Sequence, residues 1–206
     1  REGYDFEMIY FNSDGRESSM CGNGGRCIVA FAEQLGVIED RAHFLAIDGE
    51  HEAIIRKDGW VELKMTDVLN VEAGADYFYL NTGSPHYIKF VEDVNKVNVF
   101  EQGRAIRYND RFKNEGTNVN FVQPTETGIT VATYERGVED ETLSCGTGVT
   151  AAAIAHYLKS EAKPTRVPIQ VKGGRLEVRF EPNGEVFHNI WLCGPAELVF
   201  EGEIQI

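Results

Sequence analysis

The stretches Met20-Cys-Gly-Asn-Gly24 and Ser144-Cys-Gly-Thr-Gly148 share one pattern. Each runs into an apolar segment, R-C-I-V-A-F-A-E-Q-L at residues 26–35 and T-A-A-A-I-A-H-Y-L at residues 150–158. Apolar residues on nearly every side of a helix favour burial inside a core. The pattern therefore predicts two buried helices, headed by Cys21 and Cys145.

The similarity extends on both sides of the two cysteines at a constant offset of 124 residues (145 minus 21). Tyr10 corresponds to Tyr134, and the run L-A-I-D-G at residues 45–49 corresponds to I-Q-V-K-G at residues 169–173. The pairs Asp58-Gly59 and Asn183-Gly184 each separate two alternating runs, as the turns of β-hairpins do. A long internal repeat of this kind predicts two similar structural units.

We therefore expect an α+β fold with two pseudo-symmetric α/β domains. Each is a curved, mostly antiparallel sheet or barrel wrapped around a central buried helix. The expected units are residues 1–67 and 68–195. About 58 residues from Asp76 onward precede Tyr134, whereas nine precede Tyr10. We expect that strands of the first unit are missing together with further N-terminal sequence, and that a strand at residues 196–206 completes this unit.

Composition restricts the function. The chain has 206 residues, a net charge of -13 and a pI near 4.8. With no run of Lys or Arg, this charge argues against nucleic acid or an anionic membrane as a partner. No apolar stretch approaches the roughly 20 residues that span a bilayer, and the first residues carry no signal-peptide pattern, so the expected compartment is the cytoplasm.

Four cysteines are too few for a disulfide scaffold. The sequence has no C-x2-C pair of the kind that binds zinc. Reduced thiols are therefore expected. The sequence also has no dinucleotide fingerprint and no lysine context typical of pyridoxal enzymes. We expect chemistry that needs no cofactor and no metal.

A cysteine placed before Gly-x-Gly and a helix brings a thiol close to the N–H groups of the first helical turn. Those N–H groups and the helix dipole attract a carboxylate and favour a thiolate. Two such sites that face each other would place one sulfur on each side of a stereocentre. One thiolate could then remove an α-proton while the opposite thiol supplies another.

A plainer interpretation treats each motif as an ordinary helix start with a small buried thiol. The repeated cysteine, at a position where Ser or Asp would cap better, favours the catalytic interpretation. A disulfide or redox switch between Cys21 and Cys145 is a further alternative. Cys27 and Cys193 lack this setting, and we expect both to serve packing.

The motifs resemble those of the diaminopimelate epimerase family, within a group that includes proline racemase-like and phenazine-biosynthesis isomerase-like proteins. They are Y-F-N-S-D-G at residues 10–15, M-C-G-N-G-G-R-C at 20–27, Y-E-R-G at 134–137 and S-C-G-T-G at 144–148. The resemblance implies conversion of L,L-diaminopimelate to the meso form for lysine and peptidoglycan synthesis, by a homodimer. A racemase of another small amino or imino acid, or a non-catalytic redox-sensitive relative, is the alternative.

The resemblance also implies roles for individual residues. Cys21 and Cys145 match the two catalytic bases, and His86 matches a histidine that assists one of them. Substrate contacts are implied for Asn12, Gly22, Asn23, Asn118, Glu135, Arg136, Gly146 and Thr147, and Glu135 is also counted as catalytic. Arg136 can bind a carboxylate and Glu135 an ammonium group at the distal end of the substrate.

The sequence departs from the family pattern at two places. Ser84 stands where the family usually has Asn, so that contact is expected to differ. The N-terminal Gly-Asn-Asp-Phe motif and a glutamine-containing segment after it are absent from this sequence. A protein that truly began at Arg1 would be expected to show little or no activity.

Overall fold

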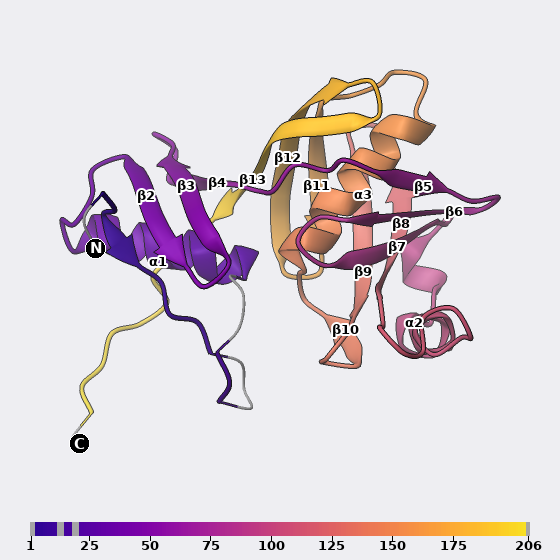
Figure 1. Ribbon diagram of the computed structural model, residues 1–206, viewed down its shortest axis with the longest axis horizontal. Coiled ribbons are helices and arrows are strands. Elements are labelled where there is room, and N and C mark those ends of the chain that lie inside the picture. Colours follow the sequence, from indigo (N-terminus) through magenta and orange to yellow (C-terminus); the bar gives the residue numbers. More distant parts are fainter. Residues whose placement is uncertain (1–2, 12–14, 18–20, 205–206) are drawn as a thin grey trace. The chain divides into compact units, whose positions relative to one another are not determined.

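The computed structural model describes residues 3–11, 15–17 and 21–204 (Figure 1). The chain forms two compact units: unit 1 comprises Arg1–Leu63 and Gly194–Ile206, and unit 2 comprises Lys64–Cys193. Each unit combines a sheet with a helix that begins directly after a cysteine. The predicted α+β class with mostly antiparallel sheets is confirmed.

The described residues of unit 1 form a small sheet and one helix. Its elements are β1 (Phe6–Glu7), α1 (Gly22–Gln34), β2 (Arg41–Ala46), β3 (Gly49–Ile55) and β4 (Trp60–Lys64). The strands follow the order β1-β2-β3-β4, in which β1 is parallel to β2 and the other neighbours are antiparallel. The predicted hairpin at Asp58-Gly59 joins β3 to β4, and Gly59 takes a φ of 81° that favours glycine.

Unit 2 contains a larger sheet, which in Figure 1 curves around one long helix, α3. Its elements are β5 (Val71–Ala73), β6 (Tyr77–Asn81), β7 (Pro85–Phe90), η1 (Val94–Lys96), α2 (Val99–Arg107), β8 (Asn118–Pro124), β9 (Ile129–Glu135), β10 (Asp140–Thr142), α3 (Gly146–Lys159), β11 (Arg166–Val171), β12 (Gly174–Asn183) and β13 (Val186–Pro195). The strand order is β13-β12-β11-β9-β8-β7-β6-β5, and β10 pairs with β9. The pairs β9–β11 and β7–β8 are parallel.

The internal repeat appears in the topology of the two units. In each, a cysteine is followed by a helix and then by antiparallel strands: α1, β2, β3 and β4 in unit 1, and α3, β11, β12 and β13 in unit 2. The parallel pairing of β1 with β2 has its counterpart in the pairing of β9 with β11. The second hairpin predicted from Asn183-Gly184 joins β12 to β13.

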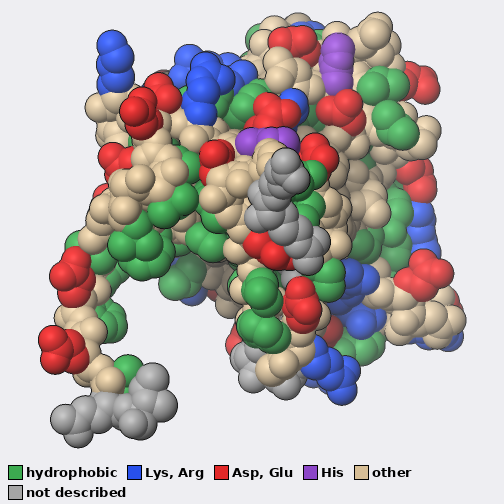
Figure 2. All heavy atoms as spheres, turned by 60° about the vertical axis from the view of Figure 1, so that its left-hand side comes forward, with side chains coloured by type: hydrophobic (Ala, Val, Ile, Leu, Met, Phe, Trp, Pro, Cys, Tyr) green, Lys and Arg blue, Asp and Glu red, His purple; other side chains and the backbone are tan. Residues whose placement is uncertain are grey.

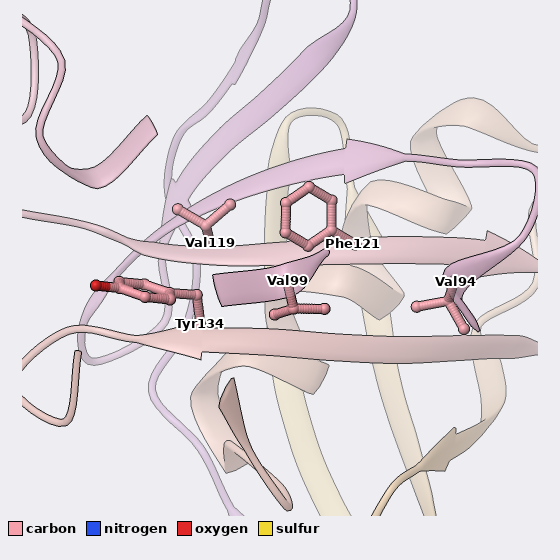
Figure 3. Packing of buried hydrophobic residues seen from close by; sticks show 5 residues of the cluster. All are labelled: Val94, Val99, Val119, Phe121 and Tyr134. Carbon is pink, nitrogen blue, oxygen red and sulfur yellow. The ribbon is translucent and has the colours of Figure 1, made fainter. Parts of the chain in front are cut away.

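Strand β8 is buried on both faces and separates two kinds of side chain. Val119 and Phe121 pack with Val99 of α2, Val94 and Tyr134 in a hydrophobic cluster (Figure 3). Asn118 and Asn120 alternate with these apolar residues, as side chains on opposite faces of a strand do. Helix α3 also packs against β7, β8 and β9, so the two asparagines belong to a polar layer next to the start of that helix.

Both helices begin four residues earlier than the apolar runs indicated, because the Gly-x-Gly segments form the first helical turns. Helix α3 is buried as predicted. Helix α1 buries only one face, and Phe31 on its other face is 54% exposed. Cys27 is likewise exposed, so the expected packing role is wrong for this residue, whereas Cys193 is fully buried as expected. The described strands of unit 1 account for the difference, since α1 packs mainly against one of them, β3.

Two further elements differ from expectation. Helix α2 was not among the elements expected from the sequence; it begins after Asn98, whose side chain accepts from Glu101 N at 3.1 Å. At the other end, the strand expected at residues 196–206 is not formed by the described residues 196–204. A strand needs a partner for its backbone groups, and this segment leaves Val199, Phe200 and Ile204 more than 80% exposed.

The surface carries mixed charge. Asp and Glu side chains are scattered among basic and hydrophobic ones on the face in Figure 2 and form no single block. Among the described residues, none of the helices is long and apolar enough to span a membrane.

Candidate active site

The two cysteines occupy the same position at the start of their helices. Cys21 precedes α1 with φ -87° and ψ 127°, and Cys145 precedes α3 with φ -119° and ψ 112°. Neither side chain forms a capping hydrogen bond. The first helical bonds run from Gly25 N to Cys21 O at 2.7 Å and from Val149 N to Cys145 O at 2.9 Å. In each unit the N–H groups of the first turn therefore point out of the helix end on which the cysteine lies.

The start of α3 is held firmly in unit 2. Thr82 donates from Oγ1 to the carbonyl oxygen of Thr147 at 2.8 Å, and Thr150 donates to the carbonyl oxygen of Gly146 at 2.9 Å. Cys145 is only 8% exposed, whereas Cys21 is half-buried. The geometry around Cys145 is therefore set by neighbouring strands as well as by the helix itself.

A polar network connects Cys145 to β7 through Thr147. The Sγ atom of Cys145 lies 3.5 Å from Thr147 Oγ1, which lies 2.9 Å from His86 Nε2. Ser84 Oγ lies 3.1 Å from the same nitrogen and 3.3 Å from Thr147 Oγ1. Two hydroxyl groups and one imidazole thus form a network that reaches the sulfur through Thr147.

His86 is a neutral side chain in this network. It is fully buried, and this burial, together with the positive charge of Arg136, lowers the pKa of His86 to about 3. At neutral pH the ring therefore carries one proton. It can donate from one nitrogen and accept at the other.

Asn118 connects this network to the segment that follows β9. Its Nδ2 donates to Ser84 Oγ at 3.0 Å and to the carbonyl oxygen of Pro85 at 2.9 Å, while its Oδ1 accepts from Arg136 N at 2.9 Å. Glu135, the last residue of β9, accepts from Thr142 Oγ1 at 2.9 Å. Asn118 therefore links the turn before β7 to the backbone of the Glu135-Arg136 pair.

Glu139 holds the residues on either side of the Glu135-Arg136 pair by hydrogen bonds. This carboxylate accepts from Gly137 N and from the hydroxyl of Tyr134, both at 3.0 Å. Glu139 takes a φ of 60°, which is uncommon for a residue other than glycine. The guanidinium of Arg136, which is exposed, donates to the carbonyl oxygen of Glu115 at 2.9 Å. The turn thus presents a cation at the surface of unit 2.

The structure brings one group of the predicted residues together within unit 2. These are His86, Asn118, Glu135, Arg136, Cys145, Gly146 and Thr147. Cys21, Gly22 and Asn23 lie at the start of α1 in unit 1, and Asn12 lies outside the described residues. Ser84, where the sequence departs from the family pattern, lies in the network beside His86.

Sequence reasoning missed Asn120, which contacts the other nitrogen of His86. The signal was present, because Asn118 and Asn120 are separated by one residue and must share a face of any strand. The described residues contain no cluster of three or more His, Cys, Asp or Glu side chains suited to hold a metal ion.

Known proteins resemble this chain over nearly its whole length. The family model described as "Diaminopimelate epimerase" matches residues 78–199. A diaminopimelate epimerase of Flavobacterium psychrophilum is 49% identical over 97% of this chain and 78% of its own length. One of Aquifex aeolicus is 43% identical over 97% of this chain and 75% of its own length.

Solved structures share the fold at low sequence identity. A PhzF-family phenazine biosynthesis protein of Bacillus anthracis superposes with a TM-score of 0.78 at 16% identity, covering 100% of this chain and 82% of that one. A hydroxyproline epimerase of Agrobacterium vitis gives 0.67 at 16% identity, covering 92% and 68%. The sequence relatives are much more similar, and on their evidence the chain belongs to the diaminopimelate epimerase family, a family of isomerases.

Proposed function

We propose that this protein interconverts L,L- and meso-diaminopimelate by direct proton transfer at Cα, with Cys21 and Cys145 as the two acid–base groups. The observation that carries the proposal is the equivalent position of the two thiols, each at the start of a helix in a repeated unit. Membership of the epimerase family supports the substrate. The proposal requires that the two sulfurs approach opposite faces of the bound substrate.

In the proposed reaction one cysteine acts as a thiolate and the other as a thiol. The thiolate takes the α-proton, so an S–H bond forms as the Cα–H bond breaks and the electron pair moves onto Cα and the carboxylate. The opposite thiol then gives its proton to the other face of Cα. The stereocentre is inverted, and the two cysteines have exchanged protonation states.

The carboxylate next to Cα must be held by hydrogen-bond donors, because negative charge develops on it during the reaction. We assign this role to the N–H groups of Gly22, Asn23, Gly146 and Thr147, which lie in the first turns of α1 and α3. Helix N-termini favour anions through their N–H groups and their dipole. The same feature favours the thiolate form of a cysteine placed there.

The distal amino-acid group of the substrate carries both charges. We propose that Arg136 binds its carboxylate and Glu135 its ammonium, with Asn12 and Asn118 fixing its orientation. Arg136 is exposed and already oriented by Glu115, which supports a role in ligand binding. His86 is proposed to assist the proton transfer from its place beside Thr147.

Solvent deuterium tests the proposed chemistry. In D2O the full-length protein should incorporate deuterium at Cα of diaminopimelate as the isomers interconvert, with no added cofactor. Cys21→Ala and Cys145→Ala should each abolish interconversion. Cys27→Ala is the matched control, because this exposed cysteine lies on α1 away from the helix start and should leave turnover unchanged. Full turnover by either of the first two variants would exclude the two-base mechanism.

A substrate panel tests the proposed specificity. Diaminopimelate should react, whereas proline and hydroxyproline lack the second charged end that Glu135 and Arg136 would bind. Turnover of an imino acid in preference to diaminopimelate would contradict the assignment. We further propose, from the family membership, a homodimer that acts in the cytoplasm in lysine and peptidoglycan synthesis; light scattering of the purified protein tests the dimer.

A further inference from the structure

Asn120 is a fully buried polar side chain of β8, and it contacts Nδ1 of His86, whereas Thr147 contacts Nε2. Its Nδ2 lies 3.0 Å from His86 Nδ1 and 3.3 Å from the carbonyl oxygen of Tyr87. Its Oδ1 accepts from Thr133 Oγ1 at 2.9 Å. A buried amide with all of these contacts has one defined orientation.

The contact with Tyr87 decides which end of the amide faces His86. A carbonyl oxygen can only accept a hydrogen bond, so the atom of Asn120 near it must be the NH2 group. The same NH2 group lies opposite His86 Nδ1 and can only donate to it. Nδ1 must therefore be the unprotonated nitrogen, and the single proton of neutral His86 resides on Nε2.

The remaining neighbours of His86 agree with this tautomer. The nitrogen Nε2 faces two hydroxyl oxygens, Ser84 Oγ and Thr147 Oγ1, which can accept its proton. A protonated ring would place an N–H against the NH2 of Asn120, which adds to the effects that already hold the pKa of His86 near 3. Of the titratable and charged groups near this network, Arg136, which follows β9, acts electrostatically on the ring, and Cys145, which heads α3, contacts Thr147. Paired opposite it on β6 is the apolar Leu80.

The direction of the hydroxyl protons follows from the same assignment of donors and acceptors. The single Nε2–H of His86 is shared between Ser84 Oγ at 3.1 Å and Thr147 Oγ1 at 2.9 Å. Ser84 Oγ also accepts from Asn118 Nδ2, so its own proton is left for Thr147 Oγ1 at 3.3 Å. Thr147 accepts from His86, and its hydroxyl proton is left for the Sγ atom of Cys145. Every donor in this chain points toward the sulfur, which is the arrangement that stabilises negative charge on it.

The backbone at the start of α3 packs closely against the amide of Asn120. A Cβ atom on Gly148 would lie 2.4 Å from Asn120 Oδ1, so only glycine lets the first turn of α3 approach Asn120 this closely. The same Cβ would lie 3.3 Å from Cys145 Sγ. The amide, the helix start and the sulfur are therefore packed as one unit.

We propose that Asn120 is a positioning residue for the proton transfer: its amide fixes His86 as the neutral Nε2–H tautomer and so directs the hydroxyl proton of Thr147 onto the sulfur of Cys145. This inference rests on the proposed function, because the acid–base role of Cys145 is assigned there. Asn120 acts through His86 and Thr147.

The tautomer can be measured directly by nitrogen NMR of protein labelled at histidine. In the unmodified protein, Nδ1 of His86 should give the signal of an unprotonated ring nitrogen and Nε2 that of a protonated one, and both should stay constant through neutral pH. Asn120→Asp replaces the donor with an acceptor of the same size. His86 should then carry a proton on Nδ1 and titrate at least about two pH units higher than before, because a carboxylate favours that proton.

Two comparisons separate this role from simple loss of packing. Thr133→Val removes the hydroxyl bonded to Asn120 Oδ1 but keeps the Tyr87 carbonyl that orients the amide, so the Nε2–H signal should persist. In the full-length enzyme, Asn120→Asp should lower kcat by at least about tenfold with little change in KM, and the pH profile of kcat should gain an inflection at the new titration of His86.

The NMR measurement needs no turnover, so it remains decisive if diaminopimelate is not the substrate. An Nδ1–H tautomer in the unmodified protein would overturn the inference, even if Asn120→Asp failed to fold. An unaltered tautomer in a folded Asn120→Asp protein would overturn it equally. Absence of epimerisation by the unmodified protein, with the expected tautomer present, would instead count against the proposed function.

Discussion

Replacing Gly148 by Ala tests how tightly the start of α3 is packed, and the internal repeat supplies its own control. The added Cβ would lie 2.4 Å from Asn120 Oδ1, closer than real Cβ atoms approach their neighbours. At the equivalent position in the repeat, a Cβ on Gly24 would lie 3.3 Å from the flexible end of Met8 and in ordinary contact with Cys21 and Tyr10, at 3.7 and 3.9 Å. The same substitution therefore meets a rigid buried amide in one unit and a side chain that can move in the other.

The expected free energies follow from these contacts. Overpacking a buried site costs roughly 1–3 kcal/mol. Displacing the Asn120 amide weakens its hydrogen bonds to His86 and Thr133, each worth about 1 kcal/mol. Ala gains about 0.5–1 kcal/mol over Gly within a helix. Gly148→Ala should therefore lose about 2–4 kcal/mol of unfolding free energy, whereas Gly24→Ala should stay within about 1 kcal/mol of the unmodified protein.

Urea denaturation followed by tryptophan fluorescence measures both effects. Trp191 lies in unit 2 with Gly148, and Trp60 lies in unit 1 with Gly24. Parallel measurements in Trp60→Phe and Trp191→Phe backgrounds assign each transition to its unit. A Gly148→Ala protein as stable as its parent would refute the close packing of Asn120 against α3. Equal losses for the two substitutions would refute the distinction between the sites.

Three further predictions concern titration and accessibility. Burial lowers the pKa of His86 from 6.5 to about 3, so as pH falls the unfolded chain takes up this proton before the folded one does. The unfolding free energy should therefore rise with pH between these two values, by up to about 1.4 kcal/mol per pH unit. His86→Gln should flatten this part of the pH–stability curve. Hydrogen bonding from Arg111 lowers the pKa of Glu72 to about 2, so the contribution of this exposed pair should be present above pH 4.5 and be lost as pH falls toward 2; urea curves of Arg111→Gln should lack that loss. Native-state alkylation followed by mass spectrometry should modify Cys27 and spare Cys193, and labelling of Cys193 before unfolding would contradict its burial.

The features that could be predicted from the sequence are those that depend on local sequence patterns. Two copies of one cysteine–glycine motif at a fixed offset predicted the repeat, and Asp58-Gly59 predicted a hairpin that the structure forms. These features depend on residues close together in the chain. Turn glycines and apolar runs report local backbone preferences directly.

Features that depend on distant partners were not predictable in the same way. The exposure of Cys27 depends on how many strands cover α1, which its apolar neighbours cannot reveal. Helix α2 owes its place to Val99 and Gly103, which pack against β8 and β9. The role of Asn120 appears only when β7, β8 and β9 are paired, because its partners His86 and Tyr87 lie on β7 and Thr133 lies on β9.

The alternation along β8 has a consequence for which changes in chain length the protein can tolerate. Val119 and Phe121 fill the cluster under α2, while Asn118 and Asn120 hold the polar layer on the other face. A shift of one residue in the pairing of β8 would exchange these two sets, burying amides in the hydrophobic cluster and placing valine and phenylalanine beside His86. Insertions in the loop before β8 are therefore compatible with this fold only when the extra residues stay in the loop and leave the pairing of β8 unchanged. Among natural variants of this protein, length differences should gather in surface turns and spare the register of β8.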